Sequence, residues 1–255
     1  MKIVNVKDVV IGEGDPKLCV SIMGNTKEEI KKEVSFLSNK EVDLIEWRLD
    51  FFTYNNEWKE IEDILALIHT FAKELPLLCT FRTQAQGGQM DIGEKHYEDL
   101  LYKMMESPYI DIIDIEYCEH RSQIYELILH AQRHHKKVLL SYHNFHQTFS
   151  YETCISLWKK MQSTGADILK IALMPKEYAD VNALMKSSFF MYTQCLKQPM
   201  IAISMSSLGK ISRLCAPFIG SSIIFVTFET ANSLGQPNIY EMRWMLKSLK
   251  NLVSK

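Results

Sequence analysis

The sequence predicts a closed (β/α)8 barrel, and three observations lead to this fold class. Eight apolar runs rich in β-branched residues recur along the chain, with starts roughly 23 to 35 residues apart, enough for a strand, a helix and two loops. The segments between the runs carry helical periodicity. The length of 255 residues suits one barrel, and no linker rich in proline, glycine or serine divides the chain. We therefore expect a single domain over residues 1–255.

The strands and helices can be placed from this pattern. The expected strands are 18–23, 42–49, 77–82, 110–117, 138–143, 168–173, 200–205 and 223–228. The clearest helices are 27–37, 57–75, 97–105, 123–133 and 151–161. The seventh helix is expected to be short or irregular, because only 206–214 precedes Pro217. An open doubly wound sheet is the main alternative, but no Gly-x-Gly-x-x-Gly or Walker loop favours it.

The first residues fall outside the eight repeats. Val4 and Val6 alternate with polar neighbours, Val9 and Ile11 do so less cleanly, and a Gly-Glu-Gly turn follows. This pattern predicts a short N-terminal β-hairpin within residues 1–14, which we expect to close the bottom of the barrel.

The composition narrows the functional class. The net charge of −2 gives no basic field for nucleic acid, although a local arginine cluster could still bind a small anion. No apolar run approaches the roughly 20 residues that span a bilayer, and the N-terminus lacks the apolar segment of a secretory signal. The six cysteines form no Cys-x-x-Cys pair. We expect a cytoplasmic protein with reduced thiols and no membrane partner.

A lysine lies inside the sixth apolar run, which reads Ala-Asp-Ile-Leu-Lys-Ile-Ala-Leu-Met-Pro over 166–175. A buried ammonium group is costly, so Lys170 tends to lose its proton, and the neutral amine is a nucleophile for a carbonyl carbon. The alternative is a structural lysine whose head group reaches water, which is the more frequent case for such a stretch taken alone.

Polar residues recur at the carboxyl ends of the predicted strands, where barrel enzymes place their active sites. They are Ser21, Glu46, Arg48, Asp50, Arg82, Asp114, Glu116, Ser141, His143, Lys170, Arg213 and the segment 231–236. Each has a structural alternative, such as an ion pair at the barrel rim or a satisfied core histidine. Together they favour a site, because so many charges at one end would cost stability without a function.

The same residues argue against other chemistries. A zinc or dimetal hydrolase of this fold needs several histidines at strand ends, and only His143 is so placed, with His146 a weaker second candidate. The glycine-rich turn of a phosphate-binding barrel is poorly represented after the last strands. Lys170 with His143 as proton carrier is the strongest nucleophilic pair.

Several motifs occur in order along nearly the whole chain. They are Glu46-Trp-Arg-Leu-Asp50, Thr80-Phe-Arg-Thr83 followed by Gly87-Gly88, Asp111-Ile-Ile-Asp-Ile-Glu116, Ser141-Tyr-His-Asn-Phe145, Ala166-Asp-Ile-Leu-Lys-Ile-Ala172 and Gly235-Gln236. With them the chain closely resembles the type I 3-dehydroquinate dehydratases, the Schiff-base lyases of the shikimate pathway. The resemblance implies a small-molecule substrate, 3-dehydroquinate, with neither metal nor organic cofactor, and a homodimer.

The resemblance also implies roles for individual residues. Lys170 would form an imine with the substrate ketone, and His143 would act as general base and then as general acid. Arg213 would bind the substrate carboxylate. The remaining substrate-binding residues would be Ser21, Glu46, Arg48, Arg82, Asn232, Ser233 and Gln236, with Gln86, Asp114, Glu116, Met205 and Phe225 in support.

The chain departs from the family pattern at two places. Gln86 stands where relatives have a glutamate that orients the catalytic histidine, so this residue can act only as a neutral orienting group. The loop over 231–236 lacks the proline of its relatives, and we expect it to be a lid that becomes ordered on substrate. Two other functions stay open on the residues alone: a class I aldolase-like lyase that uses the same lysine, and a non-catalytic barrel that binds carboxylates.

Overall fold

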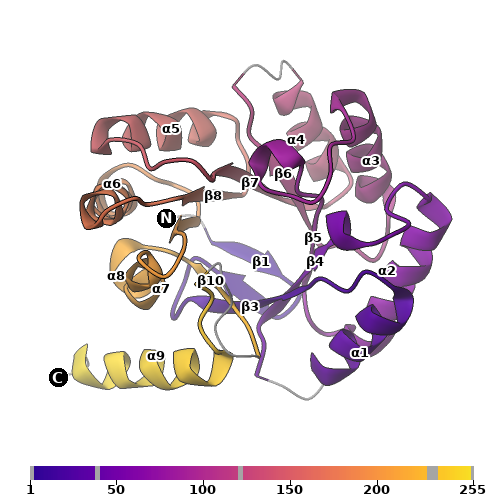
Figure 1. The fold of residues 1–255 in the computed structure, drawn as a ribbon, viewed down its shortest axis with the longest axis horizontal. Coiled ribbons are helices and arrows are strands. Elements are labelled where there is room, and N and C mark those ends of the chain that lie inside the picture. Colours follow the sequence, from indigo (N-terminus) through magenta and orange to yellow (C-terminus); the bar gives the residue numbers. More distant parts are fainter. Residues whose placement is uncertain (1–2, 38–40, 120–122, 229–234, 254–255) are drawn as a thin grey trace.

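The structure, a computed structural model, describes residues 3–37, 41–119, 123–228 and 235–253. Eight parallel strands form one sheet in the order β10-β3-β4-β5-β6-β7-β8-β9 (Figure 1). A parallel bridge from Met200 to Ser221 links the two edges, and the Ser222 amide donates to the Met200 carbonyl at 2.7 Å. The predicted (β/α)8 barrel is therefore confirmed.

The strands and helices alternate along the chain. The barrel strands are β3 Lys17–Ile22, β4 Leu44–Arg48, β5 Leu77–Thr80, β6 Ile112–Glu116, β7 Lys137–Asn144, β8 Ile168–Leu173, β9 Met200–Ser204 and β10 Ile223–Val226. The helices are α1 Lys27–Leu37, α2 Trp58–Ala72, α3 Glu94–Glu106, α4 Ile124–Arg133, α5 Tyr151–Ser163, α6 Tyr178–Gln194, α7 Lys210–Leu214, α8 Ala216–Ile219 and α9 Ile239–Val253, with 3-10 turns η1 Leu49–Phe51 and η2 Gln84–Gln86.

Side chains that point into the barrel change in character along its axis. The strand residues nearest the amino ends are apolar, including Leu44, Leu78 and Ile112, and they form one buried cluster. The hairpin of β1 Val4–Val6 and β2 Val9–Ile11 packs onto this cluster through Val4, Val6 and Ile11. Figure 1 shows β1 on the far side of the barrel, across its axis. The predicted hairpin thus does close the bottom.

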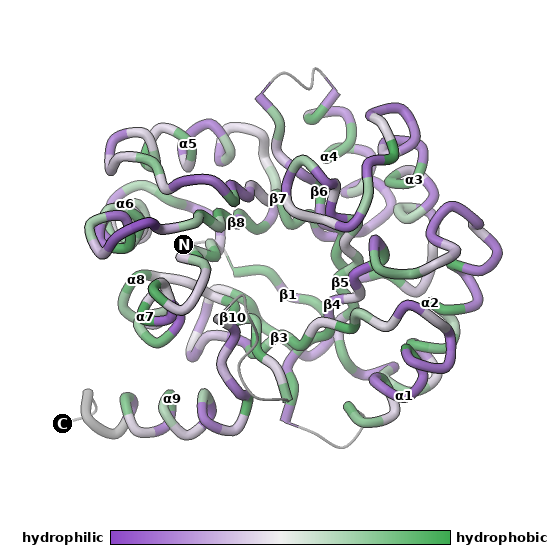
Figure 2. Tube along the Cα trace, in the orientation of Figure 1, coloured by the Kyte–Doolittle hydropathy of each residue, from purple (hydrophilic) through white to green (hydrophobic). Residues whose placement is uncertain are grey.

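A second and larger core lies between the barrel and its helices. It includes Trp47 and Trp158, both fully buried. The strands are mostly hydrophobic, whereas the helices carry hydrophilic stretches along their outer faces (Figure 2). Because both faces of a parallel sheet are covered in this fold, near-continuous apolar runs were the correct signal for its strands.

The element boundaries differ from prediction where local bonding changes. The strand expected over 77–82 ends at Thr80, because the Arg82 amide donates to the Asp50 carboxylate and no longer to a neighbouring strand. The helix expected over 57–75 ends at Ala72, four residues before Pro76, where the Leu75 amide closes a turn on the Ala72 carbonyl. The seventh helix is short, as expected, and is followed by the four-residue α8.

Candidate active site

A cavity of about 280 Å³ opens at the carboxyl ends of the barrel strands. It brings together many of the residues predicted from sequence. These are Ser21, Glu46, Arg48, Arg82, Gln86, His143, Lys170, Met205, Arg213, Phe225 and Gln236. Asn232 and Ser233, together with most of the expected lid over 231–236, lie outside the described residues.

Lys170 lies in the middle of β8 and is only 5% exposed. Burial lowers the pKa of its ammonium group. The charge of Glu46 opposes this shift, while the charge of Arg82 adds to it. The Lys170 Nζ atom lies 3.9 Å from the centroid of the Phe225 ring, which forms part of the cavity wall. The structural alternative, a lysine whose head group reaches bulk water, is therefore wrong.

His143 lies near the end of β7, and its ring lines the same cavity. Its pKa is well below the ordinary value, first because the ring is desolvated and then because Arg82, Lys170 and Arg48 are positively charged. The Nδ1 atom is buried without a hydrogen-bond partner in the described part of the chain. A neutral imidazole in this position can accept a proton, as a general base must.

Arg82 is held by acidic side chains beneath the cavity. Its Nη2 atom lies 2.6 Å from Asp114 Oδ2, and its Nη1 atom lies 2.8 Å from Glu116 Oε1. Nη1 also donates to Ser141 Oγ at 2.9 Å. Asp114 and Glu116 do not line the cavity, so they support the site by fixing the Arg82 guanidinium and neutralising its charge.

Glu46 has hydroxyl groups as its hydrogen-bond donors. Ser21 Oγ donates to Oε2 at 2.5 Å, and Thr80 Oγ1 donates to Oε1 at 3.0 Å. Burial alone would raise the pKa of Glu46, but the charges of Lys170 and Arg48 and the Ser21 hydrogen bond lower it below its usual value. Glu46 is therefore an anion that balances the cationic wall of the cavity.

Two arginines at the cavity differ in their surroundings. Arg48, the last residue of β4, makes a two-bond ion pair with Asp50, with both N–O distances 2.8 Å. Arg213, on α7, donates from Nη1 to the Ser204 carbonyl at 3.2 Å. Burial lowers the pKa of Arg213 to about 10. A guanidinium in so dry a position attracts a carboxylate strongly.

Sequence analysis named Ser141 among the polar residues at the strand ends but gave it no role, and it did not single out Thr80 or Phe145. Thr80 and Ser141 join the buried hydrogen bonds between Glu46, Asp114 and Arg82. Threonine and serine are ordinary strand residues, so only their spacing, two positions before Arg82 and His143, could have placed them on the inner face. Phe145, two residues after His143, lines the cavity for the same reason.

The comparisons with known proteins now decide the family. Residues 18–253 match the family model described as type I 3-dehydroquinase. The chain belongs to the type I 3-dehydroquinase family.

Relatives of this family match over nearly their full length. The 3-dehydroquinate dehydratase of Clostridium novyi is 36% identical over 253 residues, which are 99% of this chain and all of the relative. That of Salmonella typhimurium is 34% identical over 249 residues, 98% of this chain and 99% of the relative. The type I enzyme of Clostridium difficile, solved with covalent modified comenic acid, superposes with a TM-score of 0.95 at 35% identity and covers 98% of this chain and 99% of its own.

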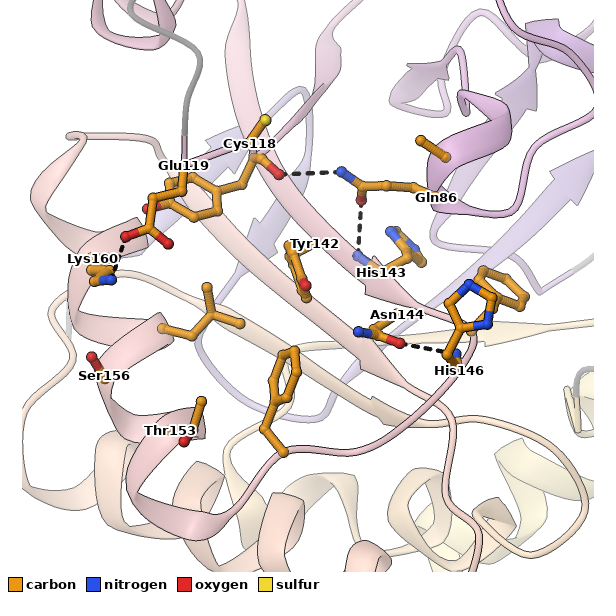
Figure 3. Close-up of a pocket in the computed structure, with 15 residues that line it drawn as sticks. Gln86, Cys118, Glu119, Tyr142, His143, Asn144, His146, Thr153, Ser156 and Lys160 are labelled. Carbon is orange, nitrogen blue, oxygen red and sulfur yellow. Dashed lines mark hydrogen bonds and ion pairs between the residues drawn. The ribbon is translucent and has the colours of Figure 1, made fainter.

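A second pocket, of about 410 Å³, adjoins the cavity that holds Lys170 (Figure 3). It is lined by residues of β7, of α5 and of the segment after β6. It shares Gln86, His143 and Phe145 with the site but does not reach Lys170. The exposed His146, the weaker histidine candidate, lines this second pocket and not the cavity with Lys170. Lys170 and His143 therefore line the smaller cavity together.

Gln86 lies between the two pockets and bonds to main chain on both sides. Its Oε1 atom accepts the His143 amide at 2.8 Å, and its Nε2 atom donates to the Tyr117 carbonyl at 3.2 Å (Figure 3). Both bonds involve main-chain atoms and not the His143 ring. Gln86 therefore fixes the end of β7 through the His143 backbone, whereas the sequence suggested a neutral group that orients the histidine.

Proposed function

We propose that this chain dehydrates 3-dehydroquinate to 3-dehydroshikimate through a Schiff base on Lys170. The observation that carries the proposal is the presence, in one cavity, of a buried lysine with a lowered pKa and of a neutral histidine. Membership in the type I 3-dehydroquinase family supports the same reaction.

Imine formation is the first step. The neutral Lys170 amine attacks the ketone carbon, one proton is taken up from solvent, the carbonyl oxygen leaves as water, and a cationic imine remains; hydrolysis of the product imine later returns this proton. Glu46, an anion at the cavity wall, stabilises the positive charge. Arg213 binds the carboxylate of the substrate, while Arg48, Ser21 and Gln236 bind its hydroxyl groups.

Elimination is the second step. His143 removes a proton from the carbon next to the imine, and the electron pair of that bond moves to the imine nitrogen to give an enamine. The enamine returns its electrons and expels hydroxide from the next carbon, and the proton on His143 converts this hydroxide to water. A second water hydrolyses the product imine, which frees Lys170 and 3-dehydroshikimate. The sum is loss of one water, and no metal or organic cofactor takes part.

Trapping with borohydride tests the proposal. The protein is incubated with 3-dehydroquinate, reduced with borohydride and digested, and its peptides are weighed. The expected result is a reduced adduct on Lys170, which is absent in Lys170→Ala, together with loss of nearly all turnover in that variant. An adduct on another lysine, or turnover that survives Lys170→Ala, would defeat the proposal. In His143→Ala the imine should form and turnover should stop after it.

We also propose that the chain acts as one domain, in the cytoplasm, as a homodimer without nucleic-acid partners. The net charge of −2 supports the last point. In the described part of the chain, no helix is long and apolar enough to cross a bilayer. Light scattering that gave a mass of one chain would contradict the dimer.

A further inference from the structure

Asp50 lies just beyond β4, in η1, and is 2% exposed although it carries a charge. Both of its carboxylate oxygens are occupied by donors from two segments. Oδ1 accepts Arg48 Nε at 2.8 Å and the Arg82 amide at 3.3 Å. Oδ2 accepts Arg48 Nη2 at 2.8 Å and the Gln89 amide at 3.3 Å. Asp50 does not line the cavity, but Arg48, Arg82 and Gln89 do.

The ion pair between Arg48 and Asp50 fixes the direction of the Arg48 guanidinium. A two-bond pair between arginine and carboxylate allows one planar orientation, and the Phe51 ring adds a second contact, with its centroid 4.9 Å from Arg48 Cζ. A long side chain at the mouth of a cavity otherwise has several rotamers of similar energy. Arg48 therefore faces the cavity already ordered, and binding does not have to order it.

The same carboxylate holds the loop between β5 and α3. Arg82 and Gln89 lie on either side of η2 in this loop, and both donate their amides to Asp50. Gln86 and Gly87, inside the loop, line the cavity. One buried group thus fixes a charged side chain of β4 and the loop that holds the end of β7 through Gln86.

We infer that Asp50 is a positioning residue that presents Arg48 and the 82–89 loop to the substrate. This inference rests on the proposed function for its kinetic consequence, but its effect on the loop is independent of turnover. The role differs from general support of the fold, because it requires Asp50 to act on substrate through Arg48.

A matched control exists at the other end of β4. Asp43 precedes the strand, pairs with Arg243 at 2.8 Å and accepts the Leu18 amide at 2.6 Å. It therefore makes the same two kinds of bond as Asp50, an ion pair with an arginine and a hydrogen bond from a main-chain amide, although it accepts one such amide where Asp50 accepts two. It lies away from the cavity, so Asp43→Asn measures the cost of losing such bonds in the fold alone.

The test is a double-mutant cycle in KM and kcat for 3-dehydroquinate. Asp50→Asn should raise KM about tenfold and change kcat less than about threefold, because a charge-assisted pair to a binding residue is lost. In an Arg48→Met background the same change should alter KM less than about twofold, because the oxygen of the introduced asparagine still accepts a loop amide and only the ion pair with Arg48 is lost. Asp43→Asn should leave both constants near those of the wild type. A KM in Asp50→Asn within about twofold of wild type, or a full effect in the Arg48→Met background, would overturn the inference.

Hydrogen exchange provides the readout that does not need turnover. Peptides that cover 82–89 should exchange faster in Asp50→Ala than in the wild type, and they should be unchanged in Asp43→Ala. Unchanged exchange of this loop in Asp50→Ala would also overturn the inference. A wild-type protein without activity on 3-dehydroquinate would count against the proposed function only, since the exchange experiment would still decide the role of Asp50.

Discussion

The ammonium nitrogen of Lys170 lies over the face of the Phe225 ring, 3.9 Å from its centroid. The Phe225 ring acts on the pKa of Lys170 in two opposite directions. The apolar ring keeps water from the amine, which disfavours the charged form, while its negative face attracts the remaining positive charge. In the proposed mechanism, this balance sets how much neutral amine is available to attack the ketone of the substrate.

Phe225→Leu should shift the acid limb of imine formation to lower pH. Leucine keeps the site dry but removes the attraction of the ring for the ammonium, about 2 kcal/mol at a desolvated site, so the pKa of Lys170 should fall further. The rate of borohydride trapping as a function of pH measures this shift. Tyr151→Leu is the control, because the Tyr151 ring faces Lys186, 4.8 Å away and outside the cavity. An upward shift in Phe225→Leu would contradict the account.

Gln86→Glu should raise the pH at which turnover begins. A carboxylate beside the end of β7 stabilises a protonated His143 and so raises its pKa, which is now well below the ordinary value. An ionised glutamate at this position has no proton to donate, so the hydrogen bond to the Tyr117 carbonyl is lost. The free energy of unfolding should therefore also fall by about 1–3 kcal/mol. The pH profile of kcat and urea unfolding measure the two effects.

Gln84→Glu is the matched control for that substitution, because Gln84 is exposed in the same 3-10 turn. It adds the same charge without touching His143 or Tyr117. A pH profile that moved equally in both variants would show a general effect of charge and not the contact with β7.

Gly87→Ala should disturb the wall between the two pockets. Gly87 has φ +88°, and a Cβ atom there would lie 2.1 Å from the Phe145 ring. Gly93 has φ +70° with nothing near an added Cβ atom. Gly93→Ala should therefore cost only the backbone strain at φ +70° and ψ 156°, about 1–3 kcal/mol of unfolding free energy, without a change in KM. Gly87→Ala should lower the free energy of unfolding by more than this and should raise KM, because the displaced Phe145 ring lines the cavity. An unchanged KM would contradict this account.

His143 should make the fold less stable in acid. Its pKa in the folded protein lies well below the ordinary value, so below about pH 6.5 the unfolded chain binds the proton that the folded chain refuses. Stability is then lost as the pH falls from about 6.5 toward the folded pKa. Urea unfolding at pH 7.5 and 5 should show a smaller loss in His143→Gln than in the wild type. The exposed His96→Gln should behave like the wild type.

Much of the site follows from spacing, and the rest follows from the closure of the barrel. Alternation along β4 and β6 correctly placed Glu46 with Arg48 and Asp114 with Glu116 on the inner face. It could not show that Arg82 bonds to both acids of β6, because the stagger of neighbouring strands decides which side chains are level. It also could not separate Asp50 from its neighbours, since Asp50 turns away from the cavity only where β4 gives way to η1.

The plug formed by Val4, Val6 and Ile11 has a kinetic consequence. Because these side chains pack on the apolar layer at the lower end of the barrel, the described residues leave no route out of the cavity at that end. The water released during elimination and the organic product must leave by the route through which the substrate enters. Product release therefore competes with substrate binding at the carboxyl ends of the strands. Substitutions of residues at this opening should alter turnover even where the chemical steps are unchanged.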